Sequence, residues 1–161
     1  MTLARLIASG FGAGFSPIAP GTAGSLLGLA LGAILLTISP ILLAAITLLI
    51  GFGGMPIISI AVPIRMRPVG ASQADHLDPG WVVIDEVAGQ CLALLALPRP
   101  SWGGVALAFV LFRVFDITKL GPIGWADRQG GAWGIMADDL IAGFVACLLV
   151  WGAHVEWPRY I

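Results

Sequence analysis

Five long apolar runs, separated by polar or turn-forming residues, predict five membrane-spanning helices. They cover residues 24–38, 41–64, 82–97, 102–115 and 138–155. A stretch ahead of them, residues 2–9, predicts a short helix lying at the membrane interface. Several runs are shorter than the roughly 20 residues that a helix needs to cross a bilayer core. We therefore expect charged helix ends at headgroup depth.

Glycine and proline mark the breaks between the runs. Residues 10–25 read as a Gly-rich loop, Ser39-Pro40 as a tight turn, and residues 98–100 as a second turn. Residues 65–80 and 116–137 are the polar stretches. The second run is itself predicted to be interrupted, because it contains several helix-breaking residues: Gly51, Gly53, Gly54 and Pro56.

Composition supports a membrane protein. Of the 161 residues, 58% are hydrophobic and 11% are charged, and the mean hydropathy is +0.98. Soluble domains are about 45–50% apolar and about 25% charged. We predict an all-α integral membrane bundle in a single domain, residues 1–161. A net charge of −1 without a run of like charge excludes a nucleic-acid partner. Short helices with small interfaces favour a homodimer.

The cations predict the orientation in the membrane. Five spans place six of the eight Lys and Arg residues on the side of the N-terminus: Arg5, Arg65, Arg67, Arg113, Lys119 and Arg128. The other side holds Arg99 and Arg159. By the positive-inside rule the first side is cytoplasmic. All acidic residues except Glu156 lie on that side, so three polar stretches are expected to converge on one face.

The adjacent carboxylates Asp85 and Glu86 stand at the start of an apolar run. Ionisable groups at membrane depth are costly and usually functional. The structural alternative is an interhelical salt bridge, for example to Arg113.

Six carboxylates are predicted on the cytoplasmic face: Asp85, Glu86, Asp116, Asp127, Asp138 and Asp139. Such a cluster needs a counter-charge, and Mg²⁺ binds through few carboxylates together with water and substrate phosphate. For Asp138-Asp139 the alternative is an ordinary helix N-cap.

Arg113, Asp116 and Lys119 are spaced at i, i+3 and i+6. On a helix Asp116 would face both cations, either as an ion pair at the helix end or as part of a phosphate site. The segment 19–25 opens a helix with Gly, Thr and Ser, which is typical of a capped helix start or of a phosphate-binding turn.

Other hydrolytic routes lack their residues. The chain has two histidines, and His154 falls on the opposite side from His76. Cys91 and Cys147 both lie in apolar runs and read as core residues. A carboxylate-held metal that activates water is the remaining route, with attack by an aspartate to form an aspartyl-phosphate intermediate as the alternative.

Four motifs resemble the phosphatidylglycerophosphatase A family of bacterial membrane phosphatases. They span nearly the whole chain, at residues 14–25, 78–90, 112–119 and 127–143. The resemblance implies Mg²⁺-dependent removal of the terminal phosphate from phosphatidylglycerophosphate, a phospholipid of the bacterial inner membrane, at its cytoplasmic face. In this family a lysine is expected where this chain has Leu77.

The resemblance also implies roles for individual residues. The implied metal ligands are Asp85, Glu86, Asp116, Asp138 and Asp139. The implied catalytic carboxylates are Asp85, Glu86, Asp116 and Asp139. The implied substrate-binding residues are Thr22, Ser25, Asp78, Arg113, Lys119 and Arg128.

Two competing functions have weaker support. A transporter or small channel is favoured by the interrupted second run, because ion-coupled carriers use broken helices. Against it, the chain shows no internal repeat and its acids lie at one face instead of at the midplane. An alcohol phosphotransferase acting on another phospholipid would need an Asp-Gly-containing repeat of aspartates that the sequence lacks.

Overall fold

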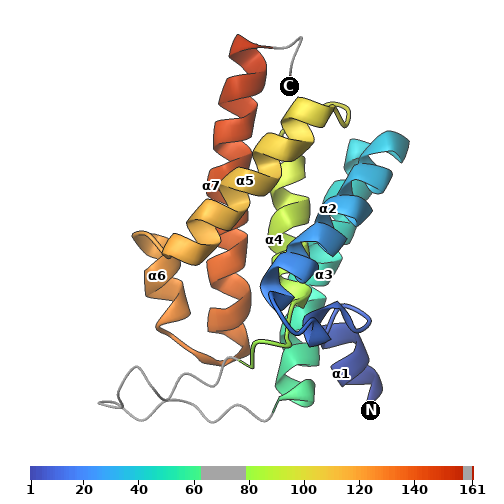
Figure 1. Cartoon of the computed structure of the whole chain (residues 1–161), viewed down its shortest axis with the longest axis vertical. Helices are drawn as coiled ribbons and strands as arrows, with labels where there is room; N and C mark the ends of the chain where they lie inside the picture. Colours follow the sequence, from blue (N-terminus) through green and yellow to red (C-terminus); the bar gives the residue numbers. More distant parts are fainter. Residues whose placement is uncertain (63–78, 158–160) are drawn as a thin grey trace.

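A computed structural model describes residues 1–62, 79–157 and 161. The described chain is helical, as predicted. Its elements are α1 (Leu3–Ala8), the 3-10 helix η1 (Ala13–Phe15), α2 (Pro20–Ile38), α3 (Pro40–Ala61), α4 (Ile84–Leu94), α5 (Trp102–Thr118), α6 (Pro122–Asp127) and α7 (Gly131–Glu156). The long helices alternate in direction along the longest axis (Figure 1). The N-terminus and α6 therefore lie toward one end, and the C-terminus lies at the other.

Helix starts follow local chemistry. Pro20, Pro40 and Pro122 occupy first-turn positions, where a missing N–H costs nothing. Ser39 ends α2 and caps α3, because its hydroxyl accepts from the Ile41 and Leu42 amides. Ser101 caps α5 in the same way, through a 3.0 Å bond from the Gly104 amide. The two predicted turns, at Ser39-Pro40 and at residues 98–100, are thus confirmed.

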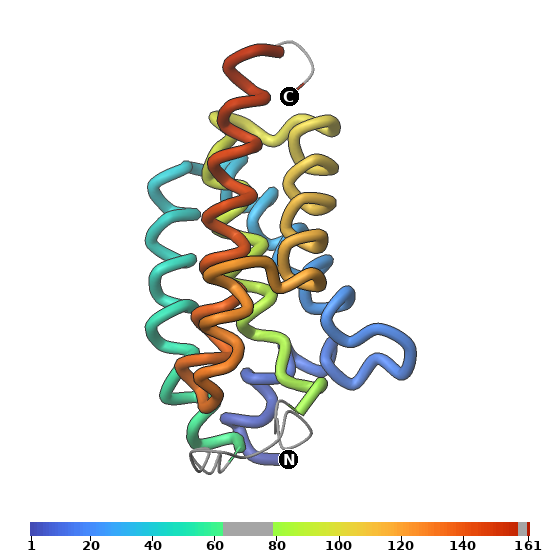
Figure 2. The backbone as a smooth tube through the Cα atoms, turned by 90° about the vertical axis from the view of Figure 1, so that its left-hand side faces the viewer, coloured from blue at the N-terminus to red at the C-terminus, as the bar shows by residue number. Residues whose placement is uncertain are grey.

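The short helix α4 is the centre of the bundle. It contacts α2, α3, α5 and α7, and almost all of its residues are buried. Two small-residue seams let neighbours approach closely. A Cβ on Gly28 of α2 would lie 2.8 Å from the Val87 carbonyl oxygen of α4. Gly89 of α4 and Gly143 of α7 face each other so closely that a methyl group on Gly143 would overlap the Gly89 backbone. The tube in Figure 2 shows α7 running the length of the molecule.

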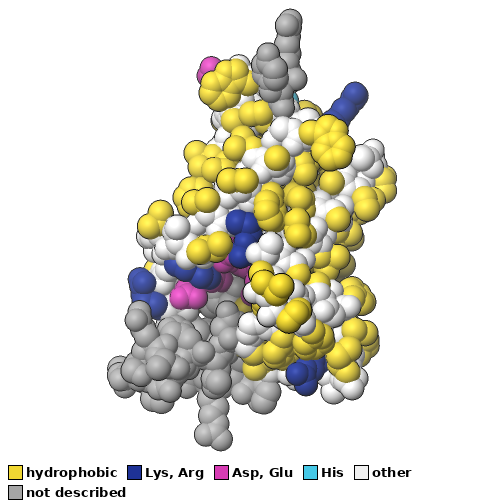
Figure 3. Space-filling model, viewed as in Figure 1, with side chains coloured by type: hydrophobic (Ala, Val, Ile, Leu, Met, Phe, Trp, Pro, Cys, Tyr) yellow, Lys and Arg dark blue, Asp and Glu magenta, His cyan; other side chains and the backbone are white. Residues whose placement is uncertain are grey.

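The outside of the bundle is apolar. Exposed large hydrophobic side chains occur along α2, α3, α5 and α7, including Ile34, Leu49, Val110 and Leu148, and yellow side chains cover much of the face in Figure 3. Three helices, α2, α3 and α7, are long and apolar enough to cross a membrane. The chain is therefore a membrane protein. Because α4 and α5 are shorter, the structure does not confirm the predicted five spans.

One predicted interruption and two predicted boundaries were wrong. The helix α3 runs without a break through Gly51, Gly54 and Pro56. Gly51 and Gly54 face α7, where a Cβ on Gly54 would lie 2.5 Å from Met136 Cε, and membrane helices tolerate such residues when neighbours support them. The helix α2 begins at Pro20, inside the predicted loop. The polar stretch 116–137 holds the end of α5, α6 and the start of α7.

Candidate active site

Asp85 and Glu86 stand in the first turn of α4. A turn at Gly80-Trp81 precedes the helix, and the Val83 amide donates a 2.9 Å bond to the Ala8 carbonyl at the end of α1. This bond ties the start of α4, and with it both carboxylates, to the N-terminal helix. A helix N-terminus favours negative charge, which offsets part of the cost of burying Asp85, whose exposure is 5%.

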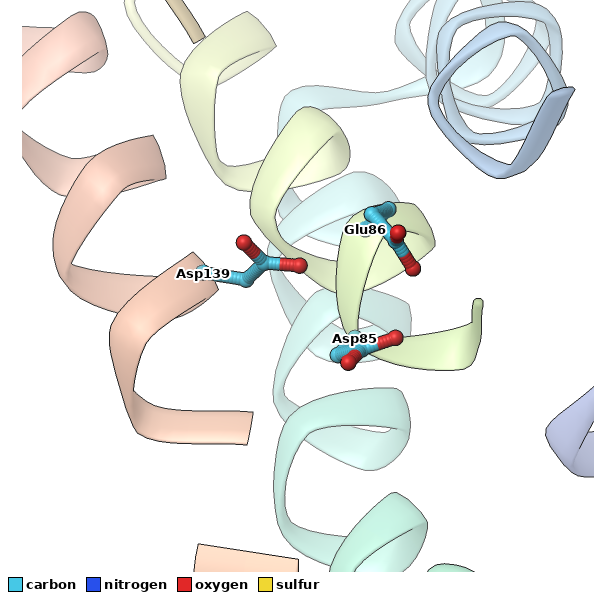
Figure 4. A group of neighbouring side chains, drawn as sticks. All are labelled: Asp85, Glu86 and Asp139. Carbon is cyan, nitrogen blue, oxygen red and sulfur yellow. The ribbon is translucent and has the colours of Figure 1, made fainter. Parts of the chain in front are cut away.

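A third carboxylate reaches this pair from α7. One carboxylate oxygen from each of Asp85, Glu86 and Asp139 lies within 4.8 Å of the other two, and Figure 4 shows the Asp139 side chain directed from α7 toward α4. The close approach of Gly89 and Gly143 brings the two helices together here. Asp139 is 3% exposed, and its Oδ1 accepts no hydrogen bond from the described residues.

Cations and further carboxylates lie beside this group. Arg113 on α5 donates from Nη1 to Asp116 and, over 3.3 Å, to the Ser25 hydroxyl on α2. Lys119 ends α5 in the left-handed conformation, with φ of 49°. Its ammonium pairs with Asp138 and lies 3.5 Å from Asp116 Oδ1 and 3.6 Å from Asp127 Oδ1.

The electrostatics of Lys119 follow from these neighbours. Burial acts to lower its pKa, but the Coulombic attraction of Asp138 and Asp139, together with the bond to Asp138, outweighs burial and raises the pKa above that of ordinary lysine. The ammonium therefore stays protonated at physiological pH. It offsets negative charge in the part of the cluster contributed by α5, α6 and α7.

The first turn of α2 forms the opposite wall. A Cβ on Gly21 would lie 2.6 Å from Glu86 Oε1 and 3.4 Å from Arg113 Nη1. A larger residue here would displace the Glu86 carboxylate and crowd the Arg113 guanidinium, so glycine lets both charged groups come against the helix. Ser25 donates to the Gly21 carbonyl over 2.8 Å while it accepts from Arg113. Thr22 lies half-buried in the same turn.

The predicted residues fall into three groups. Asp85, Glu86 and Asp139 come together, whereas Asp116 and Asp138 are held in ion pairs with the two cations. Arg128 is exposed at the end of α6, with its guanidinium against Gly124. Asp78, His76 and the polar stretch up to Asp78 lie outside the described residues.

Two predictions about the environment of these residues were wrong. Asp138 and Asp139 do not cap a helix, because α7 starts at Gly131, two turns earlier. The segment 19–25, for which one interpretation was a phosphate-binding turn, has fewer free amides than that interpretation expects. Since α2 begins at Pro20, only the Gly21 and Thr22 amides fall in its first turn with no helical acceptor.

One buried polar residue was missed. Gln90 has 0% exposure and lies on α4 one turn after Glu86. Its position four residues beyond an intramembrane acid, in an otherwise apolar run, was the available signal.

The residue types suit a divalent cation. The three close ligands are oxygen donors, which Mg²⁺ prefers, and Asp139 has a buried oxygen open to a further partner among the described residues. Within the described cluster six carboxylates surround two cations: Asp85, Glu86, Asp116, Asp127, Asp138 and Asp139 around Arg113 and Lys119. Figure 3 shows charged side chains in a hollow on one face of the molecule.

Fold and site together define a membrane protein that is helical over the described residues and has three converging carboxylates with two cationic side chains beside them. The family model of phosphatidylglycerophosphatase A matches residues 6–154. Phosphatidylglycerophosphatase A of Escherichia coli is 36% identical over 96% of this chain and 85% of its own length. The Haemophilus influenzae protein of the same name is 36% identical over 91% of this chain and 85% of its own.

A Bacteroides thetaiotaomicron protein, named as a candidate phosphatidylinositol-3-phosphatase, is 38% identical over 94% of this chain and 92% of its own length. No solved structure gives a significant match. The chain therefore belongs to the phosphatidylglycerophosphatase A family and is an enzyme, a phosphatase. The transporter alternative loses its main support as well, because α3 is continuous.

Proposed function

We propose that this phosphatase removes the terminal phosphate of phosphatidylglycerophosphate, giving phosphatidylglycerol and inorganic phosphate, with Mg²⁺ as its cofactor. The observation that carries the proposal is the approach of Asp85, Glu86 and Asp139 to within 4.8 Å, beside the Arg113 guanidinium. A phosphate monoester needs positive charge around its oxygens and a group that takes a proton from water. This arrangement offers both.

Asp85, Glu86 and Asp139 would hold the cation, with Asp116 and Asp138 next to them. When bound, Mg²⁺ supplies positive charge to the phosphoryl oxygens and acidifies water. In the reaction, water attacks phosphorus in line and a carboxylate takes its proton. The ester oxygen leaves with the glycerol and is reprotonated. Asp139 is our candidate for the base, because its Oδ1 has no hydrogen-bond donor among the described residues.

The remaining side chains bind and orient the substrate. Arg113 is held between Asp116 and Ser25. These bonds orient its guanidinium, whose remaining N–H donors lie beside Gly21. Lys119 adds a second positive charge. The Gly21 and Thr22 amides, at the positive end of α2, add donors for a phosphoryl oxygen. Asp78 and Arg128 stay in the proposal as substrate-binding residues.

We further propose five spans, with the site at the cytoplasmic face of the bacterial inner membrane. The alternating directions of α2, α3, α4, α5 and α7 support this topology (Figure 1). The distribution of cations, six against two, supports the orientation. The phosphate then meets the carboxylates at headgroup depth while the acyl chains stay in the bilayer. The homodimer stays a prediction.

The test is phosphate release from phosphatidylglycerophosphate by detergent-purified protein, with Mg²⁺ and with chelator. We expect release only with Mg²⁺, and a loss of about 100-fold or more in Asp85→Asn, which keeps the shape of the side chain and removes its charge. Glu156→Gln is the matched control, because Glu156 is exposed at the far end of α7. Full activity in chelator, or in Asp85→Asn, would refute the metal-dependent mechanism.

The name of the Bacteroides relative supports a second substrate, phosphatidylinositol 3-phosphate, which belongs in the same assay. Faster phosphate release from that lipid than from phosphatidylglycerophosphate would support the proposed site but would make phosphatidylinositol 3-phosphate the preferred substrate.

A further inference from the structure

Gln90 is a polar side chain placed where an apolar one would be expected. It is completely buried, and neither its Nε2 nor its Oε1 has a hydrogen-bond partner in the described part of the chain. Buried amides are almost always hydrogen-bonded, because leaving one unpaired costs free energy. A ligand that enters the site and completes these bonds accounts for a glutamine at this position.

Gln90 lies next to the charged site and one turn further into the molecule. Glu86 and Gln90 are four residues apart on α4 and so share one side of the helix. Both face α2, since Gly21 comes against Glu86, and a Cβ on Gly28 would lie 3.0 Å from the Gln90 Cβ. One turn corresponds to about 6 Å along the helix. In the proposed orientation, this direction leads from the headgroups toward the acyl chains.

The proposed substrate has a polar group at that depth. Its scissile phosphate is attached to a glycerol whose free hydroxyl lies on the next carbon, on the acyl-chain side of the phosphate. A hydroxyl both donates and accepts, and a glutamine amide does the same. We propose that Gln90 binds this glycerol hydroxyl and so selects the glycerophosphate headgroup over a phosphate esterified directly to diacylglycerol. This inference rests on the proposed function.

Because Gln90 is completely buried, a ligand can reach its amide only if side chains on the neighbouring helices move. Arg113 Nη1 bridges α5 and α2 through the Ser25 hydroxyl, near the glycine positions that face Glu86 and Gln90. A phosphate that recruits Arg113 competes with Ser25 for the same donor. Occupation of the phosphate site would therefore loosen this α2–α5 contact, which lies on α2 between Gly21 and Gly28, and the headgroup would follow the phosphate.

The test compares two substrates in one assay. The first is phosphatidylglycerophosphate, and the second is its deoxy analogue, in which propanediol replaces the bridging glycerol. We expect the wild type to prefer the first by about 10- to 100-fold in kcat/KM, because an unpaired buried polar group penalises the analogue. Gln90→Met, which has similar length and no amide, should lose that preference while hydrolysing the analogue at a near wild-type rate.

Controls separate recognition from folding. Cys91→Ala changes the neighbouring buried residue, whose thiol contacts the Gly28 carbonyl, and should keep the substrate preference. Gln90→Leu is prepared alongside Gln90→Met, and one of the two that folds is enough for the test. Thermal unfolding in detergent shows whether each variant is folded.

Three results would overturn the inference. One is a wild type that hydrolyses both lipids equally. Another is a Gln90 variant that slows both in parallel, and the third is a Gln90 variant that keeps the preference. A wild type that hydrolyses neither lipid would instead refute the proposed function, and the inference with it.

Discussion

At the scale of single residues, Lys119 connects the most elements. It ends α5 and pairs with carboxylates from α5, α6 and α7. Its left-handed backbone turns the side chain back across the cluster. The sequence pattern at i, i+3 and i+6 predicted the contact with Asp116. It could not predict Asp138, nineteen residues away, because that contact depends on the packing of α5 against α7.

Replacing Lys119 by Met should lower both stability and activity. The loss of the ammonium leaves three carboxylates facing one another, which we expect to cost about 1–3 kcal/mol, and phosphate release should fall about 100-fold or more. Denaturant unfolding in detergent and the phosphate assay measure the two effects. Lys119→Arg retains the charge and should retain most of the stability, so equal destabilisation in both variants would contradict this account.

The pH dependence of this ion pair follows from the raised pKa of Lys119. Because the folded-state pKa lies above the ordinary value of 10.5, the stabilisation is complete below that value. It is lost only as the pH rises through the folded-state pKa. This interaction should therefore be constant across the physiological range.

At the scale of elements, the contact between α4 and α7 sets the site. The sequence correctly predicted helices and turns in most places, because long apolar runs and Pro or Ser caps are local signals. Residue patterns alone predicted six carboxylates on one face, and the family resemblance narrowed the catalytic set to four, but neither separated the three that converge from Asp116. Asp139 reaches Asp85 because Gly89 and Gly143, far apart in sequence, allow two backbones to touch. The same glycine-rich composition hid the start of α7, where Gly130, Gly131 and Gly134 resemble a loop.

Gly143→Ala tests this contact directly. The added methyl would overlap the Gly89 backbone, so α7 must shift, at a cost of about 1–3 kcal/mol. The shift would move Asp139 away from α4, and we expect a higher Mg²⁺ concentration for half-maximal activity. Gly152→Ala is the matched control on the same helix, because a Cβ there meets nothing within 4 Å. It should be neutral or stabilising by up to about 1 kcal/mol. Equal behaviour of the two variants would contradict the proposed role of the seam.

At the scale of the whole molecule, the charged residues give the bundle a direction. Gln129 and Glu156 are exposed near opposite ends of α7. The experiment uses cells that express the protein with Cys91 and Cys147 replaced by Ala. In the Glu156→Cys variant of this protein, a membrane-impermeant maleimide should label the new thiol from outside the inner membrane. It should label Gln129→Cys only after permeabilisation. The reverse result would contradict the cytoplasmic placement of the site.

The shortness of α4 has a consequence for the choice of substrate. Eleven residues rise about 16 Å, roughly half the thickness of a bilayer core, and Asp139 lies in the third turn of α7. The carboxylates that we propose as catalytic are thus recessed between longer helices. Sugar phosphates and other water-soluble monoesters carry the same reactive group, but no acyl chain holds them at that depth. The enzyme would therefore not hydrolyse such metabolites, and it would need no pocket that recognises and rejects each of them.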